Sequence, residues 1–265
     1  MTVITVQEQH LPGASLEEKF DHALEWGFGG IELRSAGNLE FEARLPELRR
    51  ARAAGVVMPT ACVEMSHFIG AFDDELRKDA VVQLKSQLSV MAEIGGRGVM
   101  TPASYGMFSR RLPPFVPPRT EEQDTAVLVE ALALLGGHAA SEGVELYLEP
   151  LNRYEDHMVN RLADGVRLLK LAGQDAVKLA PDTYHMNIEE SDPAEALQEA
   201  ADYIGHVQAS DSNRLEPGAG HIDWALFGAT LKSIGYQGTV ALESRLSGPA
   251  AEVLPRVPSL LGRYL

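Results

Sequence analysis

Short apolar runs alternate with longer amphipathic segments from one end of the 265-residue chain to the other. The short runs have the length and pattern of strands. They predict strands at Val3–Gln7, Gly30–Leu33, Thr60–Glu64, Gly98–Thr101, Glu145–Leu148, Val177–Pro181, His206–Ser210 and Thr239–Leu242. The intervening segments follow a helical period better than a strand period. They predict helices around Leu16–Trp26, Phe41–Ala54, Glu75–Glu93, Glu121–Ser141, Leu162–Leu171, Pro193–Tyr203 and Trp224–Ile234.

Eight strands with helices between them predict an α/β protein with one closed (β/α)8 TIM barrel. The chain has a suitable length, because such barrels typically run to about 250 residues. An open doubly wound sheet is the competing fold. It should carry a glycine-rich phosphate loop after its first strand, and Gln7–Gly13 is not such a loop. The sequence shows no linker, internal repeat or low-complexity tract, so we expect a single domain over residues 1–265.

Composition narrows the range of partners. Hydrophobic residues make up 45% of the chain and charged residues 23%, which provides enough apolar material for a core. The net charge of −15 argues against nucleic acid and anionic membranes, because both would repel the chain. The sequence has neither a signal-peptide pattern nor an apolar run of about 18 residues, so we expect a soluble cytoplasmic protein. The single cysteine, Cys62, excludes an internal disulfide and a cysteine-based metal site.

One predicted connection is unusually long. Residues 102–119, PASYGMFSRRLPPFVPPR, contain five prolines and the basic residues Arg110, Arg111 and Arg119. Loops of this length without secondary structure usually serve as lids or as oligomer contacts. A proline-stiffened arm that packs on its own barrel is the alternative interpretation.

Polar residues occupy the C-terminal ends of the last four predicted strands, where (β/α)8 barrels place their active sites. These residues are Glu149, Asp182, Gln208 and Glu243. Three carboxylates and an amide that converge on one point would repel each other strongly unless a cation lay among them. Because all four are oxygen ligands, they favour Mg²⁺ or Mn²⁺ over Zn²⁺ and predict a site for one divalent ion. At any single position, a carboxylate held by a nearby Lys or Arg is the alternative.

The stretches around these positions resemble the xylose-isomerase-like sugar isomerase/epimerase superfamily. The resemblance is carried by LEPLNRYEDHMVN, PDTYHMNIEE, GHVQASDSNRLEPGAGHIDW and ALESR. It is dense from about Glu145 to Arg245, and in the N-terminal half it rests mainly on the rhythm of strands and helices. Within the superfamily the pattern is most similar to the ketose 3-epimerases of the tagatose and psicose type. These motifs are specific for the superfamily and much less specific for a substrate.

The resemblance implies a metal centre that carries out proton transfer. Glu149 and Glu243 would be both metal ligands and the acid/base pair. Asp182 would be the third ligand, and Gln208 would occupy the fourth ligand position. General chemistry agrees, because a divalent ion that polarises a ketone makes the adjacent C–H acidic. One carboxylate can remove that proton and the other can return it on the opposite face, which inverts the carbon.

The resemblance also implies three substrate contacts, Glu155, His185 and Arg214, which would bind sugar hydroxyls or the carbonyl oxygen. For His185 the alternative is a supporting role beside the metal ligands. For Arg214 the alternative is a solvated loop charge, although the residue lies in a turn directly after the strand of Gln208. His206 should point inward below Gln208, where we expect a hydrogen-bonded core histidine.

Gln208 departs from the ketose 3-epimerase pattern, which normally has histidine there in a run like GHxHxxDxNR. An amide is a weaker, neutral ligand, so we expect a looser site that accepts Mn²⁺ or Mg²⁺. Another branch of the superfamily, the catalytic subunits of bacterial C-glycoside deglycosidases, acts on 3-oxo-glycosides through the same metal and enolate chemistry and eliminates the aglycone. Two hypotheses follow. One is a metal-dependent isomerase or epimerase that enolises a keto-sugar, and the other is a lyase that cleaves a 3-oxo-glycoside.

Each hypothesis implies its own partners. Both enzymes would take a small sugar or glycoside as substrate. We expect a homo-oligomer, or a hetero-oligomer with a small subunit if the protein is a deglycosidase. DNA-repair endonucleases share the barrel but need a histidine-rich zinc cluster and a basic groove, and this acidic chain shows neither. A non-catalytic sugar-binding barrel stays as a further alternative.

Overall fold

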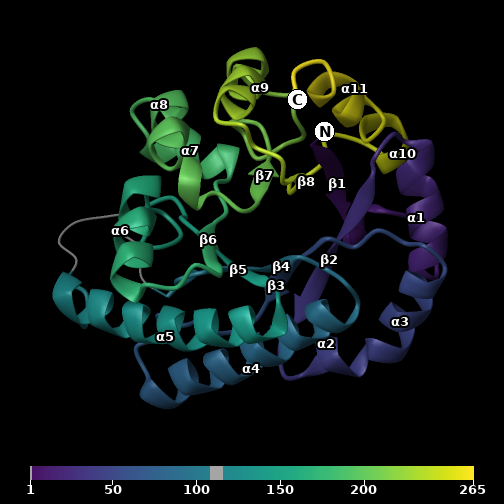
Figure 1. Cartoon of the computed structure of the whole chain (residues 1–265). Coiled ribbons are helices and arrows are strands. Elements are labelled where there is room, and N and C mark those ends of the chain that lie inside the picture. Colours follow the sequence, from purple (N-terminus) through teal and green to yellow (C-terminus); the bar gives the residue numbers. More distant parts are fainter. Residues whose placement is uncertain (1, 108–115) are drawn as a thin grey trace.

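Eight parallel strands curl into a barrel in the computed structural model, which describes residues 2–107 and 116–265 (Figure 1). The strands are β1 (Val3–Gln7), β2 (Gly30–Ala36), β3 (Thr60–Glu64), β4 (Gly98–Pro102), β5 (Glu145–Glu149), β6 (Val177–Leu179), β7 (Val207–Ala209) and β8 (Thr239–Leu242). Their hydrogen-bonded order is β6-β5-β4-β3-β2-β1-β8-β7. Isolated parallel bridges, Leu179 to Ile204 and Asp182 to Gln208, link β6 to β7. The barrel predicted from the sequence is confirmed.

Helices cover the outside of the barrel (Figure 1). The α-helices are α1 (Leu16–Glu25), α2 (Glu40–Ala43), α3 (Leu45–Ala53), α4 (Asp74–Glu93), α5 (Glu121–Glu142), α6 (Leu162–Ala172), α7 (Thr183–Glu189), α8 (Pro193–Glu199), α9 (Trp224–Ser233), α10 (Ala250–Val253) and α11 (Arg256–Leu261). Two 3-10 helices, η1 (Glu8–His10) and η2 (Ala201–Tyr203), complete the set in the described part of the chain. Figure 1 places both chain ends near β1 and β8, on the same side of the molecule.

The structure differs from the predicted elements at a few ends and in three short helices. β6 and β7 are shorter than predicted, each with three residues. The helix predicted over Phe41–Ala54 divides into α2 and α3, because Pro46 lies in the first turn of α3 and removes a backbone donor there. The short helices α7, α10 and α11 were not predicted, since seven or fewer residues give too few turns for a helical period to be visible.

Local chemistry explains where the long helices begin and end. The Asp73 side chain accepts hydrogen bonds from two backbone N–H groups at the start of α4. Thr120 and Gln123 form a reciprocal capping box at the start of α5, and Gly143 ends that helix in the left-handed region with φ of 73°. Gly98 is required where β4 meets β5, because a Cβ there would lie 2.2 Å from the carbonyl oxygen of Glu145.

Two apolar regions stabilise the barrel. The larger one lies between the sheet and the helices and includes Leu146 and Leu148 of β5. A small separate cluster, Cys62, Met100, Tyr147 and Ala180, comes from strands β3, β4 and β5 and from the end of β6. Because side chains alternate along a strand, Tyr147 and Glu149 share the face opposite to Leu146 and Leu148. Glu149 therefore belongs to the inner face of the barrel, at the C-terminal end of β5.

The long connection between β4 and α5 is described only at its two ends. Residues 108–115, which include Arg110 and Arg111, lie outside the described residues. On the C-terminal side, Nε of Arg119 donates to Oδ1 of Asp124 at 2.7 Å, and its Nη1 donates to the carbonyl of Ala71 at 3.1 Å. In the described part of the chain, no helix combines the length and apolar character needed to cross a membrane.

Candidate active site

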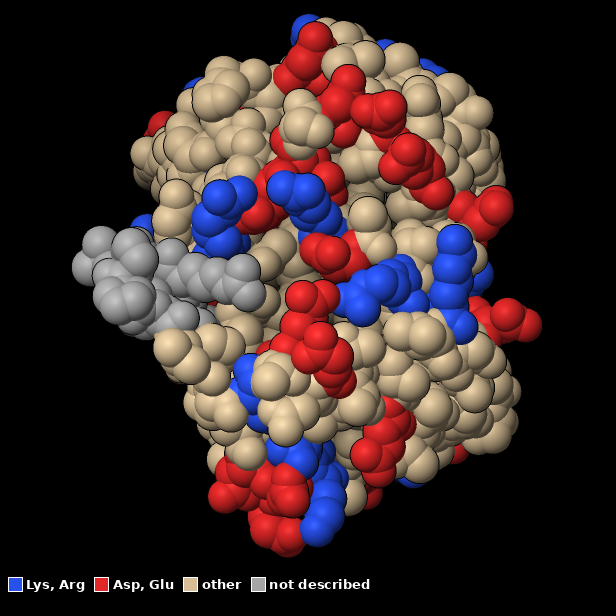
Figure 2. Space-filling view, turned by 90° about the vertical axis from the view of Figure 1, so that its left-hand side faces the viewer, with Lys and Arg blue, Asp and Glu red and all other residues tan. Residues whose placement is uncertain are grey.

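A cavity of about 690 Å³ lies at the C-terminal ends of the strands. Its charged lining residues carry both signs: Arg34, Glu64, Glu149, Glu155, Arg214, Glu243 and Arg245. Acidic and basic side chains are correspondingly mixed in the middle of the face shown in Figure 2. Apolar side chains, among them Met65, Phe68 and Tyr105, line another part of the wall. The cavity thus has charged side chains along one part of its wall and apolar side chains along another.

Glu149 and Glu243 reach this cavity from β5 and from the residue that follows β8. Burial raises the pKa of Glu149 well above its ordinary value, and the negative charges of Glu243 and Asp182 raise it further. Burial is also the main cause that raises the pKa of Glu243, and the positive charge of Arg214 partly offsets this effect. Oε1 of Glu149 is buried and has no hydrogen-bond partner within residues 2–107 and 116–265. Both carboxyl groups can therefore hold a proton above the usual pH range for glutamic acid.

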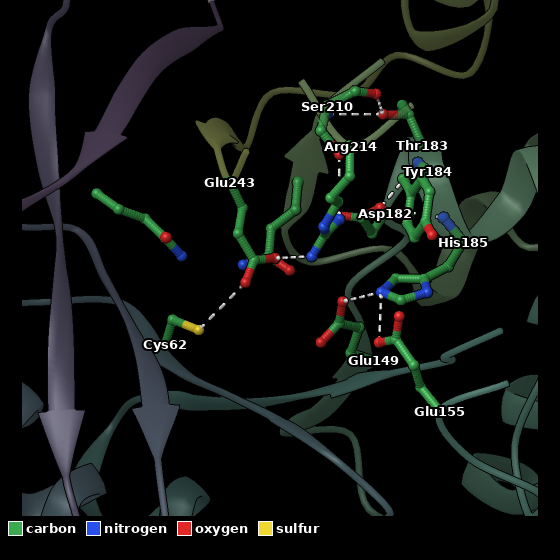
Figure 3. Close-up of polar contacts among 12 residues, drawn as sticks. Cys62, Glu149, Glu155, Asp182, Thr183, Tyr184, His185, Ser210, Arg214 and Glu243 are labelled. Atoms are coloured by element: carbon green, nitrogen blue, oxygen red, sulfur yellow. Dashed lines mark hydrogen bonds and ion pairs between the residues drawn. The ribbon is translucent and has the colours of Figure 1, made fainter. Parts of the chain in front are cut away.

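Arg214 lies between two of the acidic residues (Figure 3). Its Nη1 donates to Oδ2 of Asp182 at 2.6 Å, and its Nη2 is 3.1 Å from Oε2 of Glu243. The guanidinium also stacks over the ring of Tyr184, 5.0 Å from the centroid. Burial would lower the pKa of Arg214, but the charges of Asp182, Glu243 and Glu149 outweigh it and raise that pKa. Arg214 is therefore a partly buried cation that is paired with carboxylates of the site, and it is not a solvated loop charge.

His185 faces Glu149 and Glu155 with a defined tautomer (Figure 3). Its Nδ1 accepts a hydrogen bond from the backbone N–H of Asn152 at 3.0 Å, so the proton of the neutral ring resides on Nε2. Burial lowers the pKa of His185 to about 4, which keeps the ring neutral at pH 7. Nε2 lies 3.6 Å from Oε1 of Glu149 and 4.0 Å from Oε2 of Glu155. The N–H group points into the cavity, where it can donate to a bound oxygen.

The four strand-end residues are brought together on neighbouring strands, and part of the set suits a metal ion. One ligand atom from each of Glu149, Asp182 and His185 lies within 4.8 Å of the others. Gln208 is the bridge partner of Asp182, and its Oε1 is buried with no hydrogen-bond partner among the described residues. The unpartnered Oε1 atoms of Glu149 and Gln208, together with the carboxylate of Asp182, make an oxygen-rich donor set, which fits a divalent cation.

Sequence reasoning missed Asp211, which holds the loop that carries Arg214. Its carboxylate accepts from the backbone N–H groups of Ser212, Gly218 and Ile222, and from Nε1 of Trp224 at 3.0 Å. Burial would raise the pKa of Asp211, but these hydrogen bonds outweigh it and lower that pKa. The SDSNR turn and a downstream tryptophan were the visible signals, yet the sequence does not show that they meet.

The fold and the cavity define a (β/α)8 barrel enzyme with an acidic site at the C-terminal ends of its strands, and comparison with known proteins gives the family. The model of the family described as Xylose isomerase-like TIM barrel matches residues 20–260. The chain therefore belongs to the xylose isomerase-like TIM barrel family, as its motifs predicted.

Its relatives are sugar epimerases. The chain is 38% identical over 247 residues to 3-dehydro-D-guloside 4-epimerase of Escherichia coli (strain K12), and the match covers 92% of each protein. It is 39% identical over 120 residues to D-psicose 3-epimerase of Agrobacterium fabrum (strain C58), which covers 45% of this chain and 42% of that protein. The crystal structure of apo 3-keto-D-glucoside 4-epimerase from E. coli has a TM-score of 0.92 at 36% identity, covering 99% of this chain and 100% of that one.

These comparisons decide between the two enzyme hypotheses. The relatives are named as epimerases, so the chain is an enzyme of the sugar isomerase/epimerase type. The alternative of a lyase that eliminates an aglycone is not favoured.

Proposed function

We propose that this protein is an epimerase that uses one Mn²⁺ or Mg²⁺ ion to invert a carbon beside the ketone of a 3-keto-glycoside. The observation that carries the proposal is the pair of glutamates, Glu149 and Glu243, which enter one cavity from β5 and β8 and both have raised pKa values. Inversion needs one group that removes a proton and another that returns it on the opposite face. Two protonatable carboxyl groups from different strands meet that need.

The ion would be held by Glu149, Asp182, Gln208 and Glu243. A bound divalent ion would polarise the ketone of the substrate and make the neighbouring C–H acidic. The donor set supports this assignment, because it consists of oxygens and includes two buried atoms, Oε1 of Glu149 and Oε1 of Gln208, that form no hydrogen bond with any residue the structure describes. The neutral Gln208 amide favours Mn²⁺ or Mg²⁺ bound more loosely than by a charged ligand set.

The chain's own residues would bind and orient the sugar. In its neutral tautomer His185 donates from Nε2, and Glu155 beside it can accept from a hydroxyl group. Arg214 can hold an oxygen of the substrate as well as the two carboxylates. With the sugar fixed, either Glu149 or Glu243 removes the proton and the other returns one from the opposite side. The raised pKa of each glutamate lets it carry a proton at a pH where an ordinary glutamate would have lost it, which favours this proton transfer.

The size and lining of the cavity support a glycoside as substrate. At about 690 Å³ the cavity exceeds the needs of one sugar ring, and Met65, Phe68 and Tyr105 supply an apolar wall for an aglycone. The relatives with nearly full coverage are named as acting on 3-dehydro-D-guloside and 3-keto-D-glucoside. We therefore propose a 3-keto-glycoside that is inverted at C4, with ketose 3-epimerisation as the second candidate, favoured by the match to D-psicose 3-epimerase.

The test is a turnover assay of Glu149→Gln and Glu243→Gln with methyl 3-keto-glucoside and Mn²⁺ in D₂O. The wild-type protein should form the C4 epimer and incorporate solvent deuterium at that carbon. Each variant should lose about 10²- to 10⁴-fold in kcat, because a glutamine cannot transfer the proton. Glu64→Gln, at the exposed rim of the same cavity, serves as the matched control and should keep its activity.

Three results would contradict the proposal. Turnover at the wild-type rate in both glutamine variants would favour a binding protein or an active site elsewhere. Release of methanol without epimer would restore the lyase alternative. Interconversion of D-fructose and D-psicose without any action on the glycoside would select the ketose 3-epimerase candidate.

A further inference from the structure

Four side chains converge on the carboxylate of Glu32, a fully buried residue in β2. Its Oε2 accepts from Nε2 of Gln7 at 3.0 Å and from Nε2 of Gln208 at 3.3 Å. Its Oε1 accepts from Oγ1 of Thr60 at 2.9 Å and lies 2.7 Å from Nε2 of His206. Two partners on each oxygen fill the acceptor capacity of a carboxylate. This glutamate lies among the strands of the barrel and has no part in the mechanism derived above.

The contact with Glu32 fixes which way the amide of Gln208 faces. A carboxylate only accepts hydrogen bonds, so the atom that meets Glu32 must be the NH₂ group. The amide oxygen then points away from Glu32. That oxygen is buried and has no hydrogen-bond partner in the described part of the chain, although the residue is fully enclosed. An amide that is anchored through its nitrogen, has an unpartnered oxygen and lies on the backbone bridge to Asp182 is prepared to bind a cation.

We propose that Glu32 is a positioning residue that holds the side-chain oxygen of Gln208 toward the metal site. The inference rests on the proposed function, because it takes Gln208 as a ligand. The role is the one a carboxylate plays behind a metal-bound histidine, where it accepts from the far nitrogen and orients the ring. Here the same acceptor orients an amide. A glutamine without such a partner could rotate and present its NH₂ group, which binds no metal.

Glu32 also supports the core, and the test must separate the two roles. Burial would raise the pKa of Glu32, but the charge of His206 and hydrogen bonds from His206, Gln7 and Thr60 lower it. Removing it leaves three donors besides Gln208 without their acceptor. His206 keeps one further contact, 2.9 Å from its Nδ1 to Oγ1 of Thr239. A loss of stability alone therefore says nothing about metal binding.

The experiment is a double-mutant cycle on the affinity for Mn²⁺ alone, measured by calorimetry on the metal-free full chain. Its members are wild type, Glu32→Met, Gln208→Met and the double variant. If Glu32 acts through Gln208, Glu32→Met should weaken Mn²⁺ binding by about 10- to 100-fold in the wild-type background. It should change nothing further once Gln208 is methionine. Independent, multiplicative losses in the cycle would overturn the proposal.

Glu32→Gln is the conservative control. Its amide oxygen can still accept from Gln7 and Gln208, while its NH₂ group can donate to the hydroxyl group of Thr60. It should bind Mn²⁺ nearly as well as the wild-type protein, and a loss as large as that of Glu32→Met would overturn the inference. Thermal melting of each metal-free variant reports the structural role separately.

A measurement on the wild-type protein covers the case in which Glu32→Met does not fold. In glutamine-labelled protein, one side-chain amide proton of Gln208, assigned with Gln208→Met, should resonate downfield and shift in Glu32→Gln. An unshifted proton would show that the hydrogen bond does not form and would overturn the inference. If the wild-type protein binds no Mn²⁺ at all, the proposed function fails with it. If the wild-type protein binds Mn²⁺ but the two substitutions act independently in the cycle, the positioning role of Glu32 is rejected and the proposed function stands.

Discussion

The carboxylates of Asp182, Glu243 and Glu149 surround the single guanidinium of Arg214, and their excess negative charge governs the chemistry of these residues. Arg214 contacts Asp182 and Glu243, while Glu149 pairs with no Lys or Arg of the described residues. The excess negative charge is reduced when a glutamate takes up a proton. A proton and a divalent cation therefore compete for the same oxygens.

This competition predicts proton release. Wherever the raised pKa of Glu149 leaves its carboxyl group protonated, binding of Mn²⁺ to the metal-free protein should release protons. Calorimetry in two buffers with different ionisation enthalpies measures the number released. Glu149→Gln should release fewer protons, and an equal number would assign the release to other groups.

The raised pKa also sets the sign of the pH dependence of stability. An acid whose pKa is higher in the folded than in the unfolded state stabilises the fold below its unfolded pKa. That contribution is lost as the pH rises through the folded pKa. The contribution of Glu149 should thus decline from its ordinary value of 4.5 upward in the metal-free protein. Bound Mn²⁺ should remove this decline.

His185 is predicted to contact the substrate and not the metal. In His185→Gln, KM should rise by about two- to tenfold, the effect of one lost hydrogen bond, while the affinity for Mn²⁺ stays the same. Steady-state kinetics and calorimetry measure the two quantities. His22→Gln, on the exposed side of α1, is the control. A large loss of Mn²⁺ affinity in His185→Gln would instead make His185 a ligand.

At the residue scale, the sequence predicts where a side chain lies in the fold better than it predicts which residues that side chain contacts. Glu149, Asp182 and Gln208 could be placed at one end of the barrel, because strand ends and alternation are local properties. The ion pairs of Arg214 could not be predicted, since they depend on a loop that returns toward β6. Glu32 reads as an ordinary strand residue in GIEL, and only its charge within a buried run hinted at a network.

Among the elements, the short ones carry most of the site. α7 begins at Asp182, whose Oδ1 caps the helix by accepting from the N–H groups of Tyr184 and His185 while its Oδ2 meets Arg214. One side chain thus sets the helix start, the position of His185 and the charge of the site. Long helices could be predicted from their period, but α7 has only seven residues, so its cap remained hidden.

The loop from Asp211 to Trp224 depends on a single carboxylate. Asp211→Asn should lower the free energy of unfolding by about 2 kcal/mol, because an amide can accept at only one of its two positions and two donors lose their partner. It should also raise KM, since the loop places Arg214. Urea unfolding measures the stability. Asp21→Asn on exposed α1 should stay within about 0.5 kcal/mol of wild type, and an equally small effect at Asp211 would contradict this role.

For the whole molecule, the alternation of apolar runs was sufficient to predict the barrel, because a (β/α)8 fold repeats one local unit. The acidic composition limited the partners and said nothing about the order of the strands. The oligomeric state stays a prediction: we expect a homo-oligomer, which light scattering at several protein concentrations would show.

A single barrel should unfold as one unit. Urea unfolding of the metal-free protein should show one transition, with the same midpoint by far-UV circular dichroism and by tryptophan fluorescence. Mn²⁺ at about 100 times its dissociation constant should add about 2.7 kcal/mol of stability, and chelation should remove it. Two separate transitions would indicate that the halves of the chain fold independently.

The contact between β6 and β7 connects metal binding to the closure of the barrel. Every other neighbouring pair of strands forms a continuous ladder, whereas this pair is joined by isolated bridges, one of them between Asp182 and Gln208. Two of the proposed ligands thus face each other across the weakest join in the wall. An ion bound by both residues would link β6 to β7 where the ladder of hydrogen bonds is interrupted. Metal binding and closure of the barrel would then be the same event.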